Sequence, residues 1–308
     1  MERRRVVITG MGAKTPIGLT AEESWEAAKA GKCGIAPITQ YDTTNMKAKL
    51  AGEVKGFDPA LYMDKRDARK MDRFAQLALA AAVEAVEASG LDFSAEDPYR
   101  CGVVMACGIG GLTTMQRDCI KGETKGYDKI SPFFIPMAIG NMAAAHVSIK
   151  YGLKGMTTCP VTACASGTNA VGDAMRQIRD GYAEVVVCGG AEAVINELAM
   201  GGFTSMHALC TSEDPSRASI PFDAERSGFV MGEGAGALVL RSWSTPGSGA
   251  PASWRKWRAT APPATPTTSP PLSPAERAAP RPWPSPWPTP GWPRSRWGIS
   301  TPTAPPPP

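Results

Sequence analysis

The chain has 308 residues, 43% of them hydrophobic and 20% charged, which is enough apolar material for a buried core of ordinary size. The net charge of +4 is too small to indicate a nucleic-acid partner, and no Lys/Arg block of the required length is present. The sequence contains no apolar run of about eighteen residues, and its basic start followed by a brief apolar stretch is too short for a signal peptide. We therefore expect a cytoplasmic protein without membrane contact.

Up to about Leu240 the sequence alternates β-branched apolar runs with amphipathic stretches, which predicts an α/β fold with buried strands. In chain order we expect a strand, two helices, a strand, two helices and two strands, at residues 6–9, 22–30, 71–89, 102–106, 140–151, 165–181, 185–188 and 236–240. The glycines of residues 108–111 follow one of these strands without the G-x-G-x-x-G spacing or the acidic partner of a dinucleotide site. That segment predicts a tight turn beside a cavity, and no cofactor is expected.

Cys164 has the sequence neighbours of a reactive thiol. It stands in the run V-T-A-C-A-S-G-T at residues 161–168, directly before a predicted helix. Unpaired N–H groups and the positive dipole end at a helix N-terminus stabilise a thiolate, and small neighbours leave room for a substrate carbonyl. The backbone amide of Cys164 could then donate to a developing oxyanion. A buried structural cysteine is the alternative, since most cysteines are of that kind.

The cysteines as a set give no sign of a metal site or a disulfide framework. None of the eight belongs to a C-x-x-C pair, and only two histidines accompany them. A zinc site needs clustered ligands of these types, so no metal is expected. Free thiols are typical of the reducing cytoplasm.

The composition changes completely at Arg241. Residues 241–308 hold 20 of the 29 prolines and 7 of the 8 tryptophans, and they contain no Val, Phe, Met, Tyr, His, Cys, Asp or Asn. Such proline density prevents helices and sheets, so we predict a disordered tail behind a domain of residues 1–240. A polyproline linker or partner-binding tail is one interpretation, but repeated Trp-Pro would be unusual for either.

A second interpretation is that the tail is translated in the wrong reading frame. Read from the third base of each codon, residues 282–288 become a string of Ala and mainly apolar residues typical of a helix. In the same frame, residues 258–270 permit G-Y-G-A-T-G-D-A-Y-H-I-T, and residues 297–308 permit G-Y-I-N-A-H-G-T-S-T-P. Each position is degenerate, yet one consistent frame restores globular sequence in every window. We therefore predict a frameshift near the codons for Leu240 and Arg241.

Six strings, in this order, carry a resemblance to a known family: R-R-V-V-I-T-G-M-G (4–12), I-S-P-F-F-I-P-M (130–137), T-A-C-A-S-G-T-N-A (162–170), V-C-G-G-A-E-A (187–193), G-G-F-T-S-M-H-A-L (201–209) and P-F-D-A-E-R-S-G-F-V-M-G-E-G-A-G (221–236). With them, residues 1–240 resemble the N-terminal part of a β-ketoacyl-acyl carrier protein synthase of the type II elongating kind. That family has the thiolase fold, a layered α-β-α-β-α arrangement of two similar halves. The resemblance implies that the first half is present here and that most of the second is replaced by the tail.

The same resemblance implies the chemistry of Cys164. In the family, this cysteine accepts an acyl group from acyl carrier protein as a thioester, and a malonyl-carrier thioester is then decarboxylated and condensed with it. Two histidines, supported by a lysine and a glutamate, complete the reaction in motifs resembling D-A-Y-H-I-T and N-A-H-G-T-S-T-P. Those strings occur only in the other frame, and neither His146 nor His207 matches them. We expect the intact enzyme to be a homodimer that uses acyl- and malonyl-loaded carrier protein, and the 308-residue chain to be inactive.

Other positions have functional interpretations of less weight. By resemblance, Ile109 and Phe203 line or gate the acyl channel, with plain core packing as the alternative. Glu233, in G-E-G-A-G, is expected to be buried and paired. A basic cluster over about two helical turns is expected to attract an acidic carrier protein, with an ordinary solvated helix face as the alternative; it consists of Lys65, Arg66, Arg69, Lys70 and Arg73.

Two other functions compete with the condensing enzyme. The chain could be a non-catalytic half-domain that binds carrier protein or dimerises, with a tail for SH3- or WW-like modules. It could also be a decarboxylating or chain-length partner subunit of the same fold, but such subunits lack the cysteine that Cys164 supplies. The condensing enzyme of the intact gene is therefore the preferred prediction.

Overall fold

The computed structural model describes residues 4–243. The predicted disorder of the tail falls on residues 244–308, which lie outside the described residues. Strand β8 (Gly234–Ser242) continues through Arg241 and Ser242, so the last strand runs two residues beyond the predicted boundary at 240.

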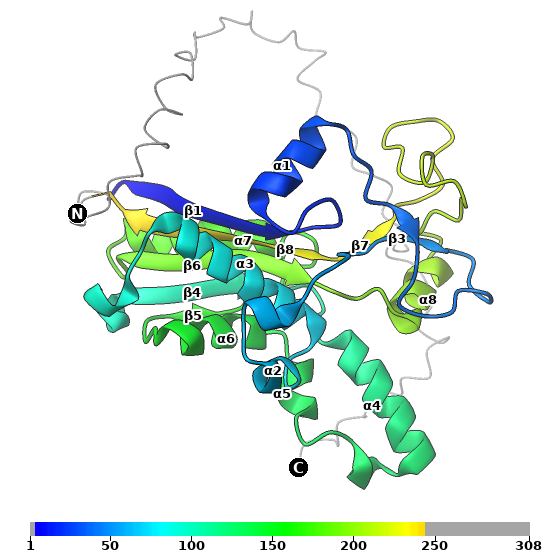
Figure 1. The fold of residues 1–308 in the computed structure, drawn as a ribbon, viewed down its shortest axis with the longest axis horizontal. Helices are drawn as coiled ribbons and strands as arrows, with labels where there is room; N and C mark the ends of the chain where they lie inside the picture. Colours follow the sequence, from blue (N-terminus) through cyan, green and yellow to red (C-terminus); the bar gives the residue numbers. More distant parts are fainter. Residues whose placement is uncertain (1–3, 244–308) are drawn as a thin grey trace, which may run out of the picture. The chain divides into compact units, whose positions relative to one another are not determined.

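A five-stranded sheet forms the centre of the described fold (Figure 1). Strand β8 is antiparallel to both of its neighbours, β1 and β6, whereas β4 is parallel to β6 and β5. In spatial order the strands are β1 (Val6–Lys14), β8, β6 (Val185–Glu192), β4 (Cys101–Ala106) and β5 (Thr157–Thr158). Parallel neighbours need long crossovers, and here these contain α6 (Met142–Tyr151) and α7 (Ser166–Arg179). Helix α3 (Arg73–Ser89), which precedes β4, also covers the sheet.

Successive residues of the central strands face different helix layers. On β6, Val185 and Val187 lie in the core that contains α3 and α6, whereas Val186 and Cys188 lie in the core that contains α7. Figure 1 views the sheet with α3 in front of it. Full burial of a Val side chain contributes about 1.5–3 kcal/mol, so an uninterrupted apolar run stabilises both interfaces. The described residues therefore form the α/β arrangement that the sequence predicts.

Smaller elements surround this centre. A second, three-stranded sheet has the order β2 (Ala36–Pro37), β3 (Leu50–Gly52) and β7 (Met231–Gly232). The remaining α-helices are α1 (Ala21–Lys29), α2 (Lys65–Ala68), α4 (Leu112–Lys125), α5 (Phe134–Ala138) and α8 (Glu197–Ser205). Short 3-10 turns are η1 (Pro59–Leu61), η2 (Phe93–Ala95), η3 (Pro98–Arg100) and η4 (Tyr127–Lys129). Within residues 4–243, none of the helices combines the length and the apolar character needed to cross a bilayer.

The eight predicted elements all overlap observed ones, but several are longer than predicted. Strand β1 does not stop at Thr9, because residues 10–14 continue to pair with β8. The glycines of this part of the strand allow α3 to approach closely. A Cβ at Gly12 would lie 2.1 Å from the carbonyl oxygen of Ala81 on α3. The sequence pattern therefore predicts the end of this strand at the point where, in the structure, β1 contacts α3.

Arg73 corrects one sequence prediction. Its guanidinium does not join a solvent-facing basic cluster but holds Glu233, whose side chain is fully buried. Arg73 Nε donates to Glu233 Oε2 at 2.8 Å, and Nη2 donates to Oε1 at 2.6 Å and to the carbonyl of Val54 at 2.8 Å. The expectation for Glu233, burial with a partner, is confirmed. A carboxylate with no access to water requires such a partner, and this requirement fixes the Arg73 side chain.

Replacing Arg73 with Ala should lower the free energy of unfolding by about 2–4 kcal/mol, because the change leaves Glu233 buried without its counter-charge. Urea unfolding measures this loss in a repaired chain, in which the predicted frameshift near Leu240 is corrected. The matched control is Lys70→Ala, which removes an exposed lysine paired with Asp67 and should cost at most about 0.5 kcal/mol. Equal, small losses in the two variants would contradict the assignment of Arg73 as the partner that stabilises the buried Glu233.

Candidate active site

Cys164 lies in the loop between β5 and α7, at the end of the sheet where β4, β5 and β6 finish. Cys164 is exposed, and so are its neighbours Thr162, Ala163 and Ala165. The carboxyl ends of neighbouring parallel strands are the usual place for ligands in α/β sheets. The structure therefore places the predicted nucleophile where a substrate can reach it, and excludes the alternative of a buried structural cysteine.

The loop before α7 is a sharp elbow held by its own side chains. Ala163 has a left-handed backbone with φ of 51°, a conformation that non-glycine residues adopt rarely and mainly at functional sites. The Ser166 hydroxyl accepts from the Thr162 amide at 2.8 Å and donates to the Ala163 carbonyl at 2.6 Å. The Asn169 side chain donates to the Thr162 hydroxyl at 2.6 Å. The run T-A-C-A-S-G-T-N thus supplies both the small residues and the polar groups that hold Cys164 at the tip.

Helix α7 begins two residues after Cys164, without a side-chain cap at its N-terminus. Close packing sets its position, since a Cβ on Gly190 of β6 would lie 3.1 Å from the Cα of Gly167. The helix has 14 residues, long enough for an N-terminal dipole that stabilises nearby negative charge by about 0.3–1 kcal/mol. The sequence prediction of a cysteine at a helix start is confirmed.

Glu192 is a site residue that the sequence analysis did not single out. Its carboxylate, at the end of β6, accepts from the amides of Gly108, Ile109 and Gly110 at 2.8, 2.8 and 3.0 Å. Burial raises the pKa of Glu192, while these three amides oppose that shift. A Cβ on Gly108 would lie 3.5 Å from the carbonyl oxygen of Ala163. Glu192 therefore fixes a turn that abuts the nucleophile elbow.

Two other cysteines lie beside this turn. The Sγ atoms of Cys107 and Cys159 are 3.9 Å apart, which makes them hydrogen-bonding neighbours. By contrast, Cys101 and Cys188 are buried in the core, where desolvation raises each pKa to about 12. Those two thiols stay protonated and are inaccessible to solvent. The cysteines that lie near the turn are therefore Cys164, Cys107 and Cys159.

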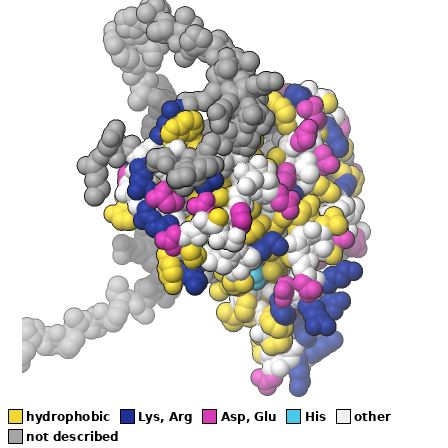
Figure 2. Space-filling view, turned by 60° about the vertical axis from the view of Figure 1, so that its left-hand side comes forward, with side chains coloured by type: hydrophobic (Ala, Val, Ile, Leu, Met, Phe, Trp, Pro, Cys, Tyr) yellow, Lys and Arg dark blue, Asp and Glu magenta, His cyan; other side chains and the backbone are white. Residues whose placement is uncertain are grey.

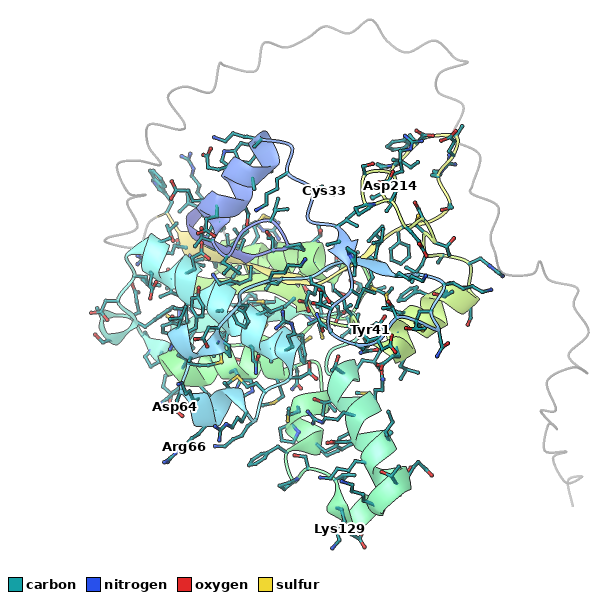
Figure 3. All side chains as sticks on the ribbon, turned by 45° about the vertical axis from the view of Figure 1, so that its right-hand side comes forward. Cys33, Tyr41, Asp64, Arg66, Lys129 and Asp214 are labelled. Carbon is teal, nitrogen blue, oxygen red and sulfur yellow. The ribbon has the colours of Figure 1, made fainter. Side chains whose placement is uncertain are left out.

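The rest of the predicted basic cluster lies on and just after α2. Lys65, Arg66, Arg69 and Lys70 are all exposed, and the first three have no ion pair within residues 4–243. Figure 3 shows Arg66 extending away from α2. Apart from Arg73, the cluster therefore has the exposure that a docking surface needs, and its binding role stays a prediction.

The predicted channel residues lie in different surroundings. Ile109 belongs to the turn held by Glu192, and its side chain is 40% exposed. Phe203 lies on α8, half-buried, with its ring 5.5 Å from that of Phe229 in an edge-to-face arrangement. Their role in an acyl channel stays a prediction.

Neither histidine is joined to Cys164 by a hydrogen bond within residues 4–243. His146 is half-buried on α6, and burial lowers its pKa, so the ring is neutral near pH 7. His207 is exposed after α8, with φ of 55°. The part of the chain that the structure describes also contains no group of three or more His, Cys, Asp or Glu side chains that could hold a metal ion.

A family model matches most of the chain, including the elbow, Cys164 and helix α7. Residues 3–245 match the family described as "Beta-ketoacyl synthase, N-terminal domain". The chain belongs to the β-ketoacyl synthase family. The thiolase-like α/β fold of the described residues agrees with that membership.

Curated β-ketoacyl synthases similar to this chain are named "3-oxoacyl-[acyl-carrier-protein] synthase 2". The protein from Vibrio cholerae is 47% identical over 244 residues, and that from Synechocystis is 44% identical over 241 residues. These alignments cover 79% and 78% of this chain but only 59% and 58% of the relatives. The chain therefore matches somewhat more than half the length of these synthases.

Solved ketosynthase structures are similar to this chain in three dimensions. One is described as a type II polyketide synthase acyl-carrier protein in complex with its ketosynthase bound to the hexaketide; its TM-score is 0.69 at 30% identity, covering 83% of this chain and 60% of that one. The ishigamide ketosynthase/chain length factor has a TM-score of 0.70 at 31% identity, covering 78% and 59%.

Proposed function

We propose that the intact gene encodes a 3-oxoacyl-acyl carrier protein synthase of fatty acid synthesis. Cys164 attacks the thioester carbonyl of an acyl-carrier protein, the carrier thiol leaves, and the acyl group stays on the Cys164 sulfur. A malonyl-carrier thioester then loses carbon dioxide, and the resulting carbanion attacks the acyl-enzyme to form the new carbon–carbon bond. The observation that carries this proposal is the exposed Cys164 at the tip of a strained elbow before α7.

The 308-residue chain lacks the groups for the second of these steps. Loss of carbon dioxide and the following attack need donors and a general acid/base, which the family has in two histidine motifs. Those motifs are compatible only with the other reading frame of residues 241–308. The curated relatives align with this chain over only 241 and 244 residues, 58% and 59% of their own length, which supports this account.

Exposed apolar residues near the elbow support the loss of a covering half. Val161 is 63% exposed, and Ile135 and Phe133 of the adjoining 130–137 segment are 61% and 41% exposed. Figure 2 shows apolar side chains reaching the surface of the face that it draws, beside a gathering of Lys and Arg. Patches of this kind mark contact sites or missing partners. In the intact enzyme, the second half would cover part of this surface, with Ile109 and Phe203 along the acyl channel.

A second copy of the chain is the other proposed partner. Strand β5 forms one edge of the described five-stranded sheet, and its Thr157 and Thr158 are both exposed. An edge strand presents unpaired backbone groups that can pair with another strand. This supports a homodimer of the intact enzyme. The eight free thiols support a reducing cytoplasm as its location.

The exposed basic residues of α2 should steer carrier binding. Charge reversal at Lys65 and Arg69 of the repaired enzyme should slow association with acyl carrier protein about tenfold or more at low salt, and much less at high salt, because screening removes long-range attraction. Stopped-flow association rates across a salt series measure the effect. Charge reversal at Lys29 and Lys32, on and after α1, is the matched control. Equal effects in both variants, or none at low salt, would show that the α2 cluster is an ordinary solvated face.

Locating the acyl group tests the proposed function directly. The repaired protein is incubated with an acyl-carrier thioester, digested and examined by mass spectrometry. We expect the adduct on Cys164, whereas an adduct on Cys159 or Cys188 would contradict the assignment. A non-catalytic half-domain, the alternative function, would bind carrier protein and form no adduct.

A further inference from the structure

The thiols of Cys107 and Cys159 form a pair that the proposed condensation does not use. Cys107 directly follows β4 and is 4% exposed, while Cys159 directly follows β5 and is half-buried. Because β4 and β5 are adjacent parallel strands, their ends bring the two Sγ atoms to 3.9 Å. Cys107 Sγ also lies 3.6 Å from the carbonyl oxygen of Gly140.

The two thiols differ in acidity and access. The hydrogen bond with Cys107 lowers the pKa of Cys159 to about 7, and this outweighs burial. The same hydrogen bond, together with burial, raises the pKa of Cys107. A more accessible thiolate beside a protonated resolving thiol is the arrangement found in cysteines that react with oxidants.

We propose that Cys107 and Cys159 are a peroxide-sensitive dithiol that closes reversibly to a disulfide. The Cys159 thiolate attacks hydrogen peroxide, so that a sulfur–oxygen bond forms, the oxygen–oxygen bond breaks and hydroxide leaves. The Cys107 sulfur then attacks the sulfenic acid of Cys159, the sulfur–oxygen bond breaks, and hydroxide leaves with the Cys107 proton as water. Two thiols and one peroxide give one disulfide and two waters, and an external dithiol reverses the change.

Closure requires the two sulfur atoms to move towards each other. A disulfide needs a sulfur–sulfur distance of about 2.05 Å, so the Sγ atoms must approach each other by about 2 Å. Gly140 leaves room for the Cys107 sulfur, since a Cβ at that position would lie 2.5 Å from it. Neither thiol is in the proposed catalytic machinery, so a disulfide between them would leave the Cys164 sulfur itself unbonded.

Formation of the disulfide should displace Cys164 in two ways, through the polypeptide chain and through packing contacts. Cys159 precedes Cys164 in the same loop, and the residue after Cys107 abuts the carbonyl of Ala163. A displacement of about 1 Å at a reacting group can cost about 10²-fold in rate. We expect oxidation to slow acylation of Cys164 at least about tenfold, a consequence that rests on the proposed function.

Peptide mapping tests the disulfide without reference to activity. The 308-residue chain and the repaired chain, both of which contain the pair, are treated with hydrogen peroxide, alkylated and digested. We expect a dithiothreitol-sensitive cross-link between the peptides of Cys107 and Cys159, with the loss of two hydrogens. Cys159→Ser and, separately, Cys107→Ser should abolish the cross-link, and Cys119→Ser, at an exposed position on α4, should not. Independent alkylation of Cys107 and Cys159 after peroxide treatment, in whichever chain unfolds cooperatively, would overturn the proposal, as would a cross-link from Cys159 to Cys164.

The acylation rate of the oxidised, repaired protein is the second readout. We expect recovery on reduction, and no peroxide effect in Cys159→Ser. A cross-link without an effect on acylation would refute the coupling to Cys164 but leave the dithiol in place. Failure of reduced protein to be acylated at all would refute the proposed function instead.

Discussion

Replacing Cys164 with Ala in the repaired enzyme should abolish acyl-enzyme formation and lower condensation by more than about 10³-fold. The proposed reaction passes through a covalent thioester, and no other thiol shares this position. Cys188 is fully buried with its pKa raised to about 12, and Cys159 lies against Cys107 rather than at the helix start. Intact-protein mass spectrometry after incubation with acyl-carrier thioester, together with turnover rates, measures both losses.

The matched control for this variant is Cys119→Ala. Cys119 is also exposed, but it lies inside α4 rather than at a helix N-terminus. Its loss should leave acylation and turnover within about twofold of the parent enzyme, as is usual for surface substitutions. Retention of the acyl group by Cys164→Ala would show that another nucleophile carries the reaction.

The 308-residue chain should not catalyse condensation, and a one-base correction near the codon for Arg241 should restore it. General acid/base catalysis and oxyanion stabilisation are each worth about 10²–10⁴ in rate, and in the proposed reaction the two missing histidine motifs supply both. We therefore expect a gain of at least about 10⁴-fold in carbon–carbon bond formation from acyl- and malonyl-carrier substrates. The uncorrected chain should also unfold more easily, because apolar residues such as Ile135 and Val161 lack their cover.

A third protein separates chemistry from folding in that comparison. It is the repaired chain with the histidines of the two recovered motifs replaced by alanine. This variant should melt like the repaired chain and accept an acyl group on Cys164, but it should not condense. Turnover by the uncorrected chain equal to that of the repaired one would refute the frameshift account.

The central strands and helices could be predicted because their signals are local. Strand β6 reads as an apolar run, and Cys164 stands between small residues at the start of a helix whose apolar positions recur regularly. Helix α4 gave no such signal, since its buried residues are Thr114, Asp118 and Gly122. They recur every four residues as a helix face should, but none is hydrophobic.

The parts of the site that depend on distant residues escaped prediction. Glu192 looks like the polar end of a strand, and its three amide partners lie more than eighty residues earlier in the chain. Arg73 has the spacing of the exposed basic residues before it, but the buried charge of Glu233 holds its half-buried guanidinium. Sequence periodicity reports which face a residue occupies and says nothing of a charge that tertiary folding brings beside it.

The nucleotide sequence of the gene from the codon for Leu240 to the codon for Pro308 tests the central claim most directly. The third base of each codon determines which residue the other frame encodes at every position that the protein sequence leaves degenerate. We expect the frame that starts at the third base of each codon to encode D-A-Y-H-I-T across residues 258–270 and N-A-H-G-T-S-T-P across residues 297–308, without a stop codon between them. Stop codons in that frame, or residues other than histidine at the two histidine positions, would contradict the account and make residues 241–308 a genuine part of this synthase-like protein.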